Sequence, residues 1–245
     1  MFLFQPAEEG GGAFAMVKEG VMDNPRVDAV FGQHVGSGHP GGAINYRRGG
    51  TMASSDTFHV AAAQIVTNLQ SIVSRQANLS QGAAVITVGM FNAGNRSNII
   101  PETAAIVGTI RTLNEPTREQ VHEAVTRMAQ KTAEAAGLSA EVKIDRGYPV
   151  LNNDPELTSR MLDALERAAG KNRVREIPPL LASEDFGAFS QRAPGFYWFL
   201  NASPHPDRAG APNHSPLFLI AEQHPKTGVK ALVNVALEYL RAAPK

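Results

Sequence analysis

The first residues that could do chemistry are two adjacent glutamates, Glu8 and Glu9. They follow the apolar run Met1–Phe4 and precede three glycines, Gly10–Gly12. Met1–Phe4 reads as a short buried strand, and from Ala13 onward the apolar residues recur at helical intervals. The two carboxylates therefore occupy a strand-to-helix corner, where α/β proteins often carry catalytic and binding groups. The structural alternative is a pair of solvated carboxylates in the first turn of a helix, favoured by its dipole.

Two histidines fall where their side chains could join these carboxylates. His34 lies near the end of the apolar stretch 27–35, which predicts a strand, and His214 lies in a loop rich in Gly, Pro and Asn. Each alone is more often a structural residue than a ligand. Together, imidazole nitrogens and carboxylate oxygens are the donors that Zn²⁺ and similar divalent ions accept. In such a site one carboxylate would bind the ion while its neighbour takes a proton from a water that the ion polarises.

Three further side chains have both a structural and a functional interpretation. Asn98 precedes a predicted strand and Arg111 lies near the far end of that strand. Arg111 is either a surface ion-pair partner, which contributes little, or a guanidinium fork for a substrate carboxylate. Glu184 follows Ser183 at the start of a predicted short helix. There Ser183 could simply be the N-cap, with acidic neighbours in the first turn.

The elements that must position these residues fall into two groups. Residues 1–50 and 151–245 alternate strand and helix, which predicts an α/β domain formed by two separate pieces of the chain. Residues 51–150 predict strand–helix–strand–strand–helix–strand, the split-βαβ order of a compact α+β domain inserted into the first. Within it, the helix over residues 117–137 is predicted to begin with Thr117 as N-cap and to end at Gly137.

Composition excludes several classes of function. The chain has 245 residues, 43% hydrophobic and 19% charged, with a formal net charge of zero, which is ordinary for a globular protein with a core. The balanced charge removes the electrostatic argument for nucleic acid or an anionic membrane as partner. No stretch approaches the ~20 apolar residues of a membrane span, and no signal-peptide pattern opens the chain. The absence of cysteine excludes disulfides, and a cytoplasmic location is the default expectation.

Taken in order, six motifs resemble one family across nearly the whole chain. The sequence is similar to the amidohydrolase branch of the M20-type metallopeptidases, which includes hippurate hydrolases, N-acyl-amino-acid deacylases and auxin-conjugate hydrolases. The motifs that carry the resemblance are FQPAEEGGGA, VDAVFGQHV, MASSDTF, SNIIPETAAIVGTIRT, ASEDFGAF and NHSP. Single motifs of this kind are weak evidence, but six in the family's order are specific.

The resemblance implies a plan, a site and a reaction. The plan is a zinc-exopeptidase-like catalytic α/β domain with an inserted ferredoxin-like lid through which two copies dimerise. The reaction is hydrolysis of the amide bond of an N-acyl amino acid, with two divalent ions, Zn, Mn, Co or Ni, in the intact enzyme. The implied roles are Glu8 as general base, Glu9, His34 and His214 as metal ligands, Asn98 and Arg111 as holders of the substrate carboxylate, and Glu184 as a residue close to the site.

Two departures from the family pattern keep other functions open. Family members carry further sequence before the QPAEEG motif, with additional metal ligands, and we expect that this part is missing here. They also carry a segment with a Gly-Gly-His turn where Val60 runs directly into Ala61. We therefore expect that this chain alone binds metal weakly and turns over little substrate. The alternatives are a metal-free binding or dimerisation paralogue, and a dipeptidase of the same family.

Overall fold

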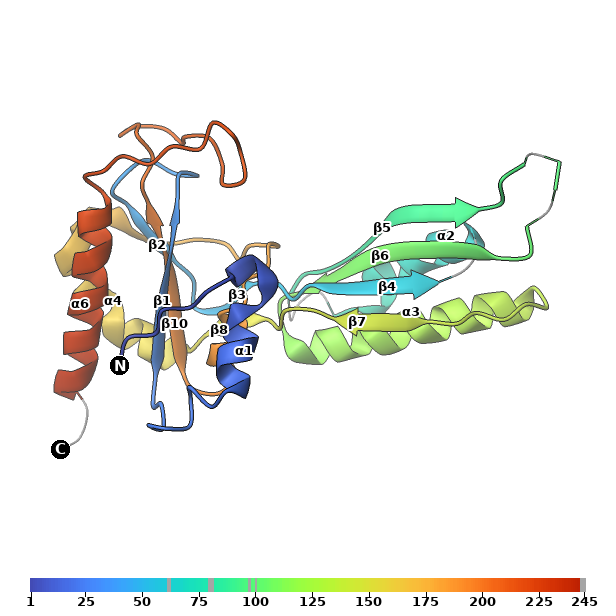
Figure 1. Cartoon of the computed structure of the whole chain (residues 1–245), viewed down its shortest axis with the longest axis horizontal. Helices are drawn as coiled ribbons and strands as arrows, with labels where there is room; N and C mark the ends of the chain where they lie inside the picture. Colours follow the sequence, from blue (N-terminus) through green and yellow to red (C-terminus); the bar gives the residue numbers. More distant parts are fainter. Residues whose placement is uncertain (61–62, 79–81, 97, 100, 243–245) are drawn as a thin grey trace.

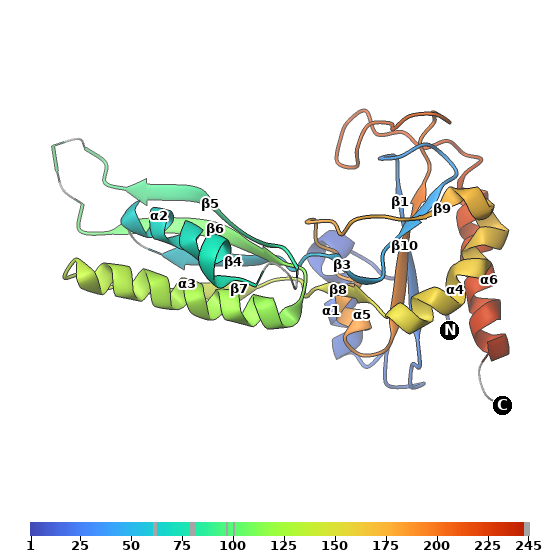
Figure 2. The same ribbon diagram turned by 180° about the vertical axis from the view of Figure 1, so that it is seen from behind.

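The computed structural model describes residues 1–60, 63–78, 82–96, 98–99 and 101–242. Figure 1 shows two lobes joined end to end, and Figure 2 shows them from behind. Both chain ends belong to the first lobe, which has a mixed sheet with helices on its two faces. The second lobe is an elongated antiparallel sheet with helices on one side. The mixed α/β class expected from the sequence is confirmed. The prediction about the junction between residues 60 and 61 involves Ala61, which lies outside the described residues.

The sheet of the first lobe contains four strands in the order β1-β10-β2-β9. β1 pairs parallel with β10, β10 antiparallel with β2, and β2 parallel with β9. α4 and α6 supply apolar side chains to one face, and α1 and α5 supply them to the other. The bounds are β1 Val30–Gly36, β2 Ile44–Tyr46, β9 Val174–Glu176, β10 Gly195–Asn201, α1 Gly12–Lys18, α4 Pro155–Ala169, α5 Gly187–Ser190 and α6 Pro225–Ala242, with short 3₁₀ turns at Glu8–Gly10 and Lys171–Arg173.

One register row crosses this sheet from edge to edge. His34 on β1 lies beside Phe199 on β10, Phe199 lies beside Asn45 on β2, and Asn45 lies beside Arg175 on β9. Paired residues of neighbouring strands point to the same face of a sheet, so these four side chains share a face. The opposite face carries Trp198, which is fully buried in the core beneath α4 and α6.

The second lobe contains a four-stranded sheet in the order β5-β6-β4-β7, in which every pair is antiparallel. Its helices pack on one face around a buried apolar cluster that includes Phe58, Leu69 and Val125. The element order along the chain is strand, helix, strand, strand, helix, strand. The bounds are β4 Asp56–Val60, α2 Ala63–Ser71 with a π-helical turn over Ile72–Gln76, β5 Ala84–Ala93, β6 Ala104–Thr112, α3 Glu115–Ala135 and β7 Lys143–Arg146.

The lobes are joined by two chain crossings that are bound to each other. β3 (Gly49–Met52) pairs antiparallel with β8 (Leu151–Asn153) at the end of the first lobe. Next to this pair, the N–H of Ser55 donates to the carbonyl of Tyr148 at 3.0 Å, and the N–H of Tyr148 donates to Ser55 Oγ at 3.4 Å. The outgoing and returning segments therefore form one hinge.

A buried charged cluster fixes this hinge to the second lobe. The Asp56 carboxylate accepts from Arg118 Nη2 at 2.6 Å, and it lies 2.9 Å from His122 Nε2. It also accepts from the N–H of Gly147 at 3.0 Å, while Glu115 accepts from the N–H of Val150 at 2.8 Å. The start of β4, the first turns of α3 and the returning chain thus meet at one carboxylate. The sequence analysis did not single out Asp56.

The expectation that Met1–Phe4 forms a buried strand is wrong. No strand is assigned there, and the side chains of Met1, Phe2 and Phe4 are exposed, Phe4 by 91%. Only Leu3 packs against the core of the first lobe. An apolar run forms a strand only where a neighbouring strand accepts its backbone hydrogen bonds, and no described strand pairs with this segment.

Two expected helix caps are also wrong. α3 begins at Glu115, and its N-cap is Asn114, whose side chain accepts from the N–H of Thr117 at 2.8 Å. Thr117 is therefore the capped residue and not the cap; a proline in the first turn allows the helix to begin earlier. Gly137 does lie just beyond α3 with φ of 73°, as a closing glycine should. Ser183 is not an N-cap, because α5 begins only at Gly187.

Candidate metal centre

The two glutamates lie on a tight corner between the N-terminal segment and α1. Ala7 and Gly11 flank the corner in left-handed conformations, with φ of 48° and 75°. Such a conformation is unfavourable for alanine, so the surrounding contacts must hold it. Gly12, the first residue of α1, packs against the backbone of Pro6: a Cβ at this position would lie 1.7 Å from the carbonyl oxygen of Pro6. The glycines after the glutamates thus permit the sharp turn.

Two residues from distant parts of the chain hold this corner in place. Asp185, which is fully buried, accepts from Gln5 Nε2 at 2.6 Å and from the N–H of Ala13 at 2.9 Å. On the other side, the hydroxyl of Tyr148 donates to the carbonyl of Glu8 at 2.6 Å. The corner is therefore fixed both to the segment before α5 and to the hinge between the lobes.

Three carboxylates meet beside this corner. One oxygen from each of Glu8, Glu184 and Asp185 lies within 4.8 Å of the others. Burial raises the pKa of Glu8, and the nearby charges of Asp185 and Glu9 raise it further. Burial and the charge of Glu8 raise the pKa of Glu184 to about 7, although Tyr197 donates a hydrogen bond to it at 2.6 Å. Close packing of like charges away from water favours a shared proton or a bound cation.

The remaining predicted ligands gather next to these carboxylates. His214 Nε2 lies 3.4 Å from Glu9 Oε1, and both side chains are 78% exposed. His34 lies near the end of β1; burial lowers its pKa, the charge of His214 lowers it further, and that of Glu9 opposes the change. The loop of His214 is fastened to β1 by Asn213, whose Nδ2 donates to the carbonyl of Val35 at 3.3 Å. Glu9, His34 and His214 are thus brought together from three distant segments.

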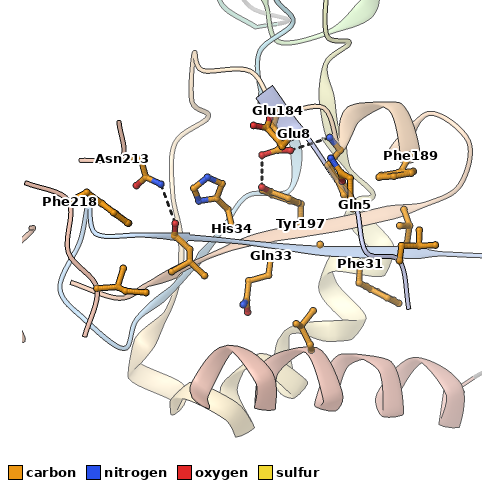
Figure 3. A pocket seen from close by; sticks show the side chains of 17 residues that line it. Gln5, Glu8, Phe31, Gln33, His34, Glu184, Phe189, Tyr197, Asn213 and Phe218 are labelled. Atoms are coloured by element: carbon orange, nitrogen blue, oxygen red, sulfur yellow. Dashed lines mark hydrogen bonds between the residues drawn. The ribbon is translucent and has the colours of Figure 1, made fainter. Parts of the chain in front are cut away.

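Figure 3 shows the cavity on which these groups open. Glu8, Glu184 and Tyr197 lie together on the same side of β1 as the His34 ring, while the Gln33 side chain points to the other side. The cavity has a volume of about 610 Å³. In the described part of the chain, none of Glu8, Glu184 and Asp185 forms an ion pair with lysine or arginine. Carboxylates without a cationic partner, in a cavity that the His34 imidazole also lines, fit the donor set that divalent cations require.

The two predicted substrate-binding residues are not brought to this cavity together. Arg111 lies at the hinge end of β6, and its Nη1 donates to the carbonyl of Leu181 at 2.8 Å, three residues before Glu184. Asn98 is exposed and belongs to the loop between β5 and β6. Figure 1 shows that this loop lies at the end of the second lobe away from the first. Within one copy of the chain, Arg111 contacts the segment that leads to Glu184 and Asn98 does not.

The sequence analysis missed several residues that shape the site. Gln5 lies in the motif FQPAEEGGGA and Asp185 in ASEDFGAF. Their positions before Glu8 and beside Glu184 were the signal by which they could have been identified as site residues. Tyr197 reads as one more aromatic residue of a core strand, and Tyr148 as a residue of a strand end. Nothing local distinguishes them, because their partners lie 13 and 140 residues away in the sequence.

The chain is similar to one peptidase family along nearly its whole length. The sequence pattern of the peptidase family M20/M25/M40 matches residues 1–238. Thermostable carboxypeptidase 2 of Saccharolobus solfataricus is 33% identical over 261 residues, covering 97% of this chain and 65% of that protein. Hippurate hydrolase of Campylobacter jejuni is 35% identical over 221 residues, covering 80% of this chain and 57% of that protein. The chain thus spans 65% and 57% of the length of these two relatives.

A solved structure agrees with the sequence comparison. The crystal structure of the YXEP protein of Bacillus subtilis, described as a dinuclear metal binding peptidase from the M20 family, superposes with a TM-score of 0.79. It is 27% identical and covers 98% of this chain and 65% of that one. No helix among the described residues is long and apolar enough to cross a membrane. The chain belongs to the peptidase family M20/M25/M40.

Proposed function

We propose that the protein containing this chain hydrolyses the amide bond of N-acyl amino acids, with Glu8 as the general base. In this proposal Glu9, His34 and His214 hold divalent metal ions. The observation that carries it is the position of Glu8: a partly buried carboxylate with a raised pKa, beside a buried acidic pair and in one cavity with the His34 imidazole. The similarity to a hippurate hydrolase supports an N-acyl amino acid as substrate.

The residues of this chain would divide the chemistry among them. Bound ions would contribute Lewis-acid polarisation of a water and of the amide carbonyl. Glu8 would take a proton from the attacking water and deliver it to the leaving amine, which requires a carboxylate whose pKa lies nearer to neutrality than usual. Tyr197 would hold the Glu184 carboxylate in place by its hydrogen bond, and Glu184 would in turn restrict the conformations that the Glu8 side chain can adopt. Asp185 and Tyr148 would keep the backbone of the corner fixed.

The substrate carboxylate would be held from the second lobe. Arg111 already reaches the segment before Glu184, and its planar donors match a carboxylate. Asn98 lies too far along the lobe to reach the same cavity, so in this proposal it acts on the site of a second copy. The active form would then be a homodimer formed through the second lobe.

The test is hydrolysis of hippurate and of N-acetyl amino acids by the full-length protein loaded with Mn²⁺, Zn²⁺, Co²⁺ or Ni²⁺. Glu8→Gln should lower kcat by about a hundredfold or more with bound metal unchanged, because the base is lost and the ligands remain. Glu19→Gln is the matched control, since Glu19 is exposed at the end of α1. Unchanged turnover in Glu8→Gln would remove Glu8 from the mechanism.

Two other functions correspond to other results. Turnover of dipeptides in preference to N-acyl amino acids would indicate a peptidase, which the similarity to a carboxypeptidase favours. Absence of bound metal after supplementation, together with absence of turnover, would indicate a binding or dimerisation module. Metal analysis of the purified protein separates this last case from both enzymes.

A further inference from the structure

A second cavity lies at the other edge of the first lobe's sheet. Its volume is about 520 Å³, and it is bordered by β2, β9 and the loops that precede β2 and α6. It shares a sheet face with the metal centre, because Asn45 and Arg175 belong to the same register row as His34. Three strand spacings separate His34 from Arg175, which is about 14 Å. The cavity is therefore distinct from the one that holds Glu8.

A buried polar side chain forms part of this cavity. Asn45 is only 3% exposed and borders the cavity. Its side-chain amide makes no hydrogen bond with any other described residue. The Asn45 amide is not among the fully enclosed, unpartnered side-chain atoms of the described residues, so it is open to the cavity, from which a water or a ligand can complete its hydrogen bonds. The amide of Asn45 therefore indicates that a polar group enters the cavity.

Two guanidinium groups stand beside this amide. Arg175 is the register neighbour of Asn45, and Arg173, the last residue of the 3₁₀ turn before β9, also borders the cavity. Among the described residues, neither has a carboxylate within ion-pair distance. Glu176 also borders the cavity, but its carboxylate is bound by Arg48 Nη1 at 2.6 Å. The positive charge on this face is therefore not neutralised by the protein.

The loop before β2 packs closely against a further side chain that borders the cavity, His224. A Cβ on Gly41 would lie 2.2 Å from His224 Nε2, and one on Gly42 would lie 2.7 Å from Arg173 Nη1. Both positions need glycine for the loop to approach these side chains so closely. Burial lowers the pKa of His224, and the positive charge of Arg173 lowers it further. Two arginines and the His224 imidazole thus surround a hollow at which Glu176, the bordering carboxylate, is already bound to Arg48.

We propose that this cavity binds the oxyanion group of a small ligand, a carboxylate or a phosphate. The guanidinium groups of Arg173 and Arg175 would each offer parallel N–H donors to two oxygens. The amide of Asn45 would donate a third hydrogen bond from the floor of the cavity. Exposed arginines at and just before an edge strand can also serve solubility alone, but that explanation does not account for the amide of Asn45 that opens on the same cavity.

The test is isothermal titration of the metal-free full-length protein with inorganic phosphate and, separately, with succinate, at low salt. Removal of the metal keeps the anions from binding at the centre around Glu9, and the assay involves no turnover, so it is independent of the proposed reaction. We expect a Kd of about 1 mM for at least one anion. The double variant Arg173→Gln/Arg175→Gln should weaken that binding at least about tenfold, because both forks are lost.

Arg241→Gln is the control for the loss of an arginine charge away from the cavity, at the far end of α6. Arg175→Lys should give an intermediate affinity, because it keeps the charge and loses the fork. Preference for phosphate or for succinate decides between the two kinds of ligand. The proposal is overturned if neither anion binds up to about 100 mM, or if the double variant binds as tightly as Arg241→Gln. Thermal unfolding of each variant shows whether it is folded.

Discussion

The buried carboxylate of Asp56 should control how firmly the second lobe and the hinge are held together. Burial alone would raise its pKa, but hydrogen bonds and charge from His122 and Arg118 outweigh burial and lower it from 3.8 to about 2. At 1.36 kcal/mol per pKa unit, this difference is worth about 2 kcal/mol of stability. Asp56→Asn removes this contribution to the free energy of unfolding. It also leaves the buried charge of Arg118 with Glu115 as its remaining carboxylate partner among the described residues.

We therefore expect Asp56→Asn to lower the free energy of unfolding by at least about 2 kcal/mol near neutral pH. Because the pKa of Asp56 is depressed in the folded state, its contribution is complete well above pH 3.8 and is lost as the pH falls toward 2. The difference between wild type and variant in urea unfolding should thus be constant above about pH 5 and should shrink on acidification.

Glu134→Gln is the control for a carboxylate that pairs at the surface. Glu134 lies 2.6 Å from Lys131, and both side chains are more than 60% exposed, so we expect no measurable change. Equal urea midpoints for Asp56→Asn and wild type at pH 7 would refute the reasoning. A difference that persists unchanged at pH 2.5 would show that the loss comes from packing and not from the ionised carboxylate.

Two further substitutions test how the corner of Glu8 is held. Tyr148→Phe removes one hydrogen bond to the carbonyl of Glu8 and keeps the ring. The free energy of unfolding should therefore fall by about 1 kcal/mol, and amide hydrogen exchange at Gly12 should accelerate. Unchanged exchange would mean that the hydroxyl does not fix the corner. Asp185→Asn replaces an oxygen that accepts from Gln5 or Ala13 by an N–H₂ group, which should cost about 1–3 kcal/mol in thermal or urea unfolding. A neutral Asp185→Asn would argue against that pair of hydrogen bonds.

The helices and most strands could be predicted because their signals are local. α4 and α6 have apolar stripes at helical spacing, and the strands of the second lobe alternate apolar and polar residues. Met1–Phe4 carried the same signal and failed, since strand formation depends on a neighbour that local sequence does not reveal. Thr117 failed as a cap because a second capping residue, Asn114, lies one turn earlier and is the one placed to accept the hydrogen bond.

The candidate site also contains some residues that the sequence could identify and others that it could not. Glu8, Glu9, His34 and His214 could be named from residue type, element ends and motif order. The contact of Asp185 with Ala13, by contrast, joins residues 172 positions apart and is decided by packing. The second cavity could not be predicted for the same reason. An arginine in a short polar strand is typical of any solvated surface, and only the strand register shows that Arg175 lies beside the buried Asn45.

The outer side of β1 has a consequence for how this chain behaves in solution. β1 has seven residues and pairs with β10 alone among the described strands, so its other side presents unpaired backbone donors and acceptors. Exposed apolar side chains lie close to it on α6, including Leu237 and Leu240. A free strand bordered by apolar surface is a template on which other chains can assemble. At high concentration, residues 1–245 by themselves should associate by pairing this edge with the same edge of a second copy, and because that contact uses the edge of both copies it should close at a pair.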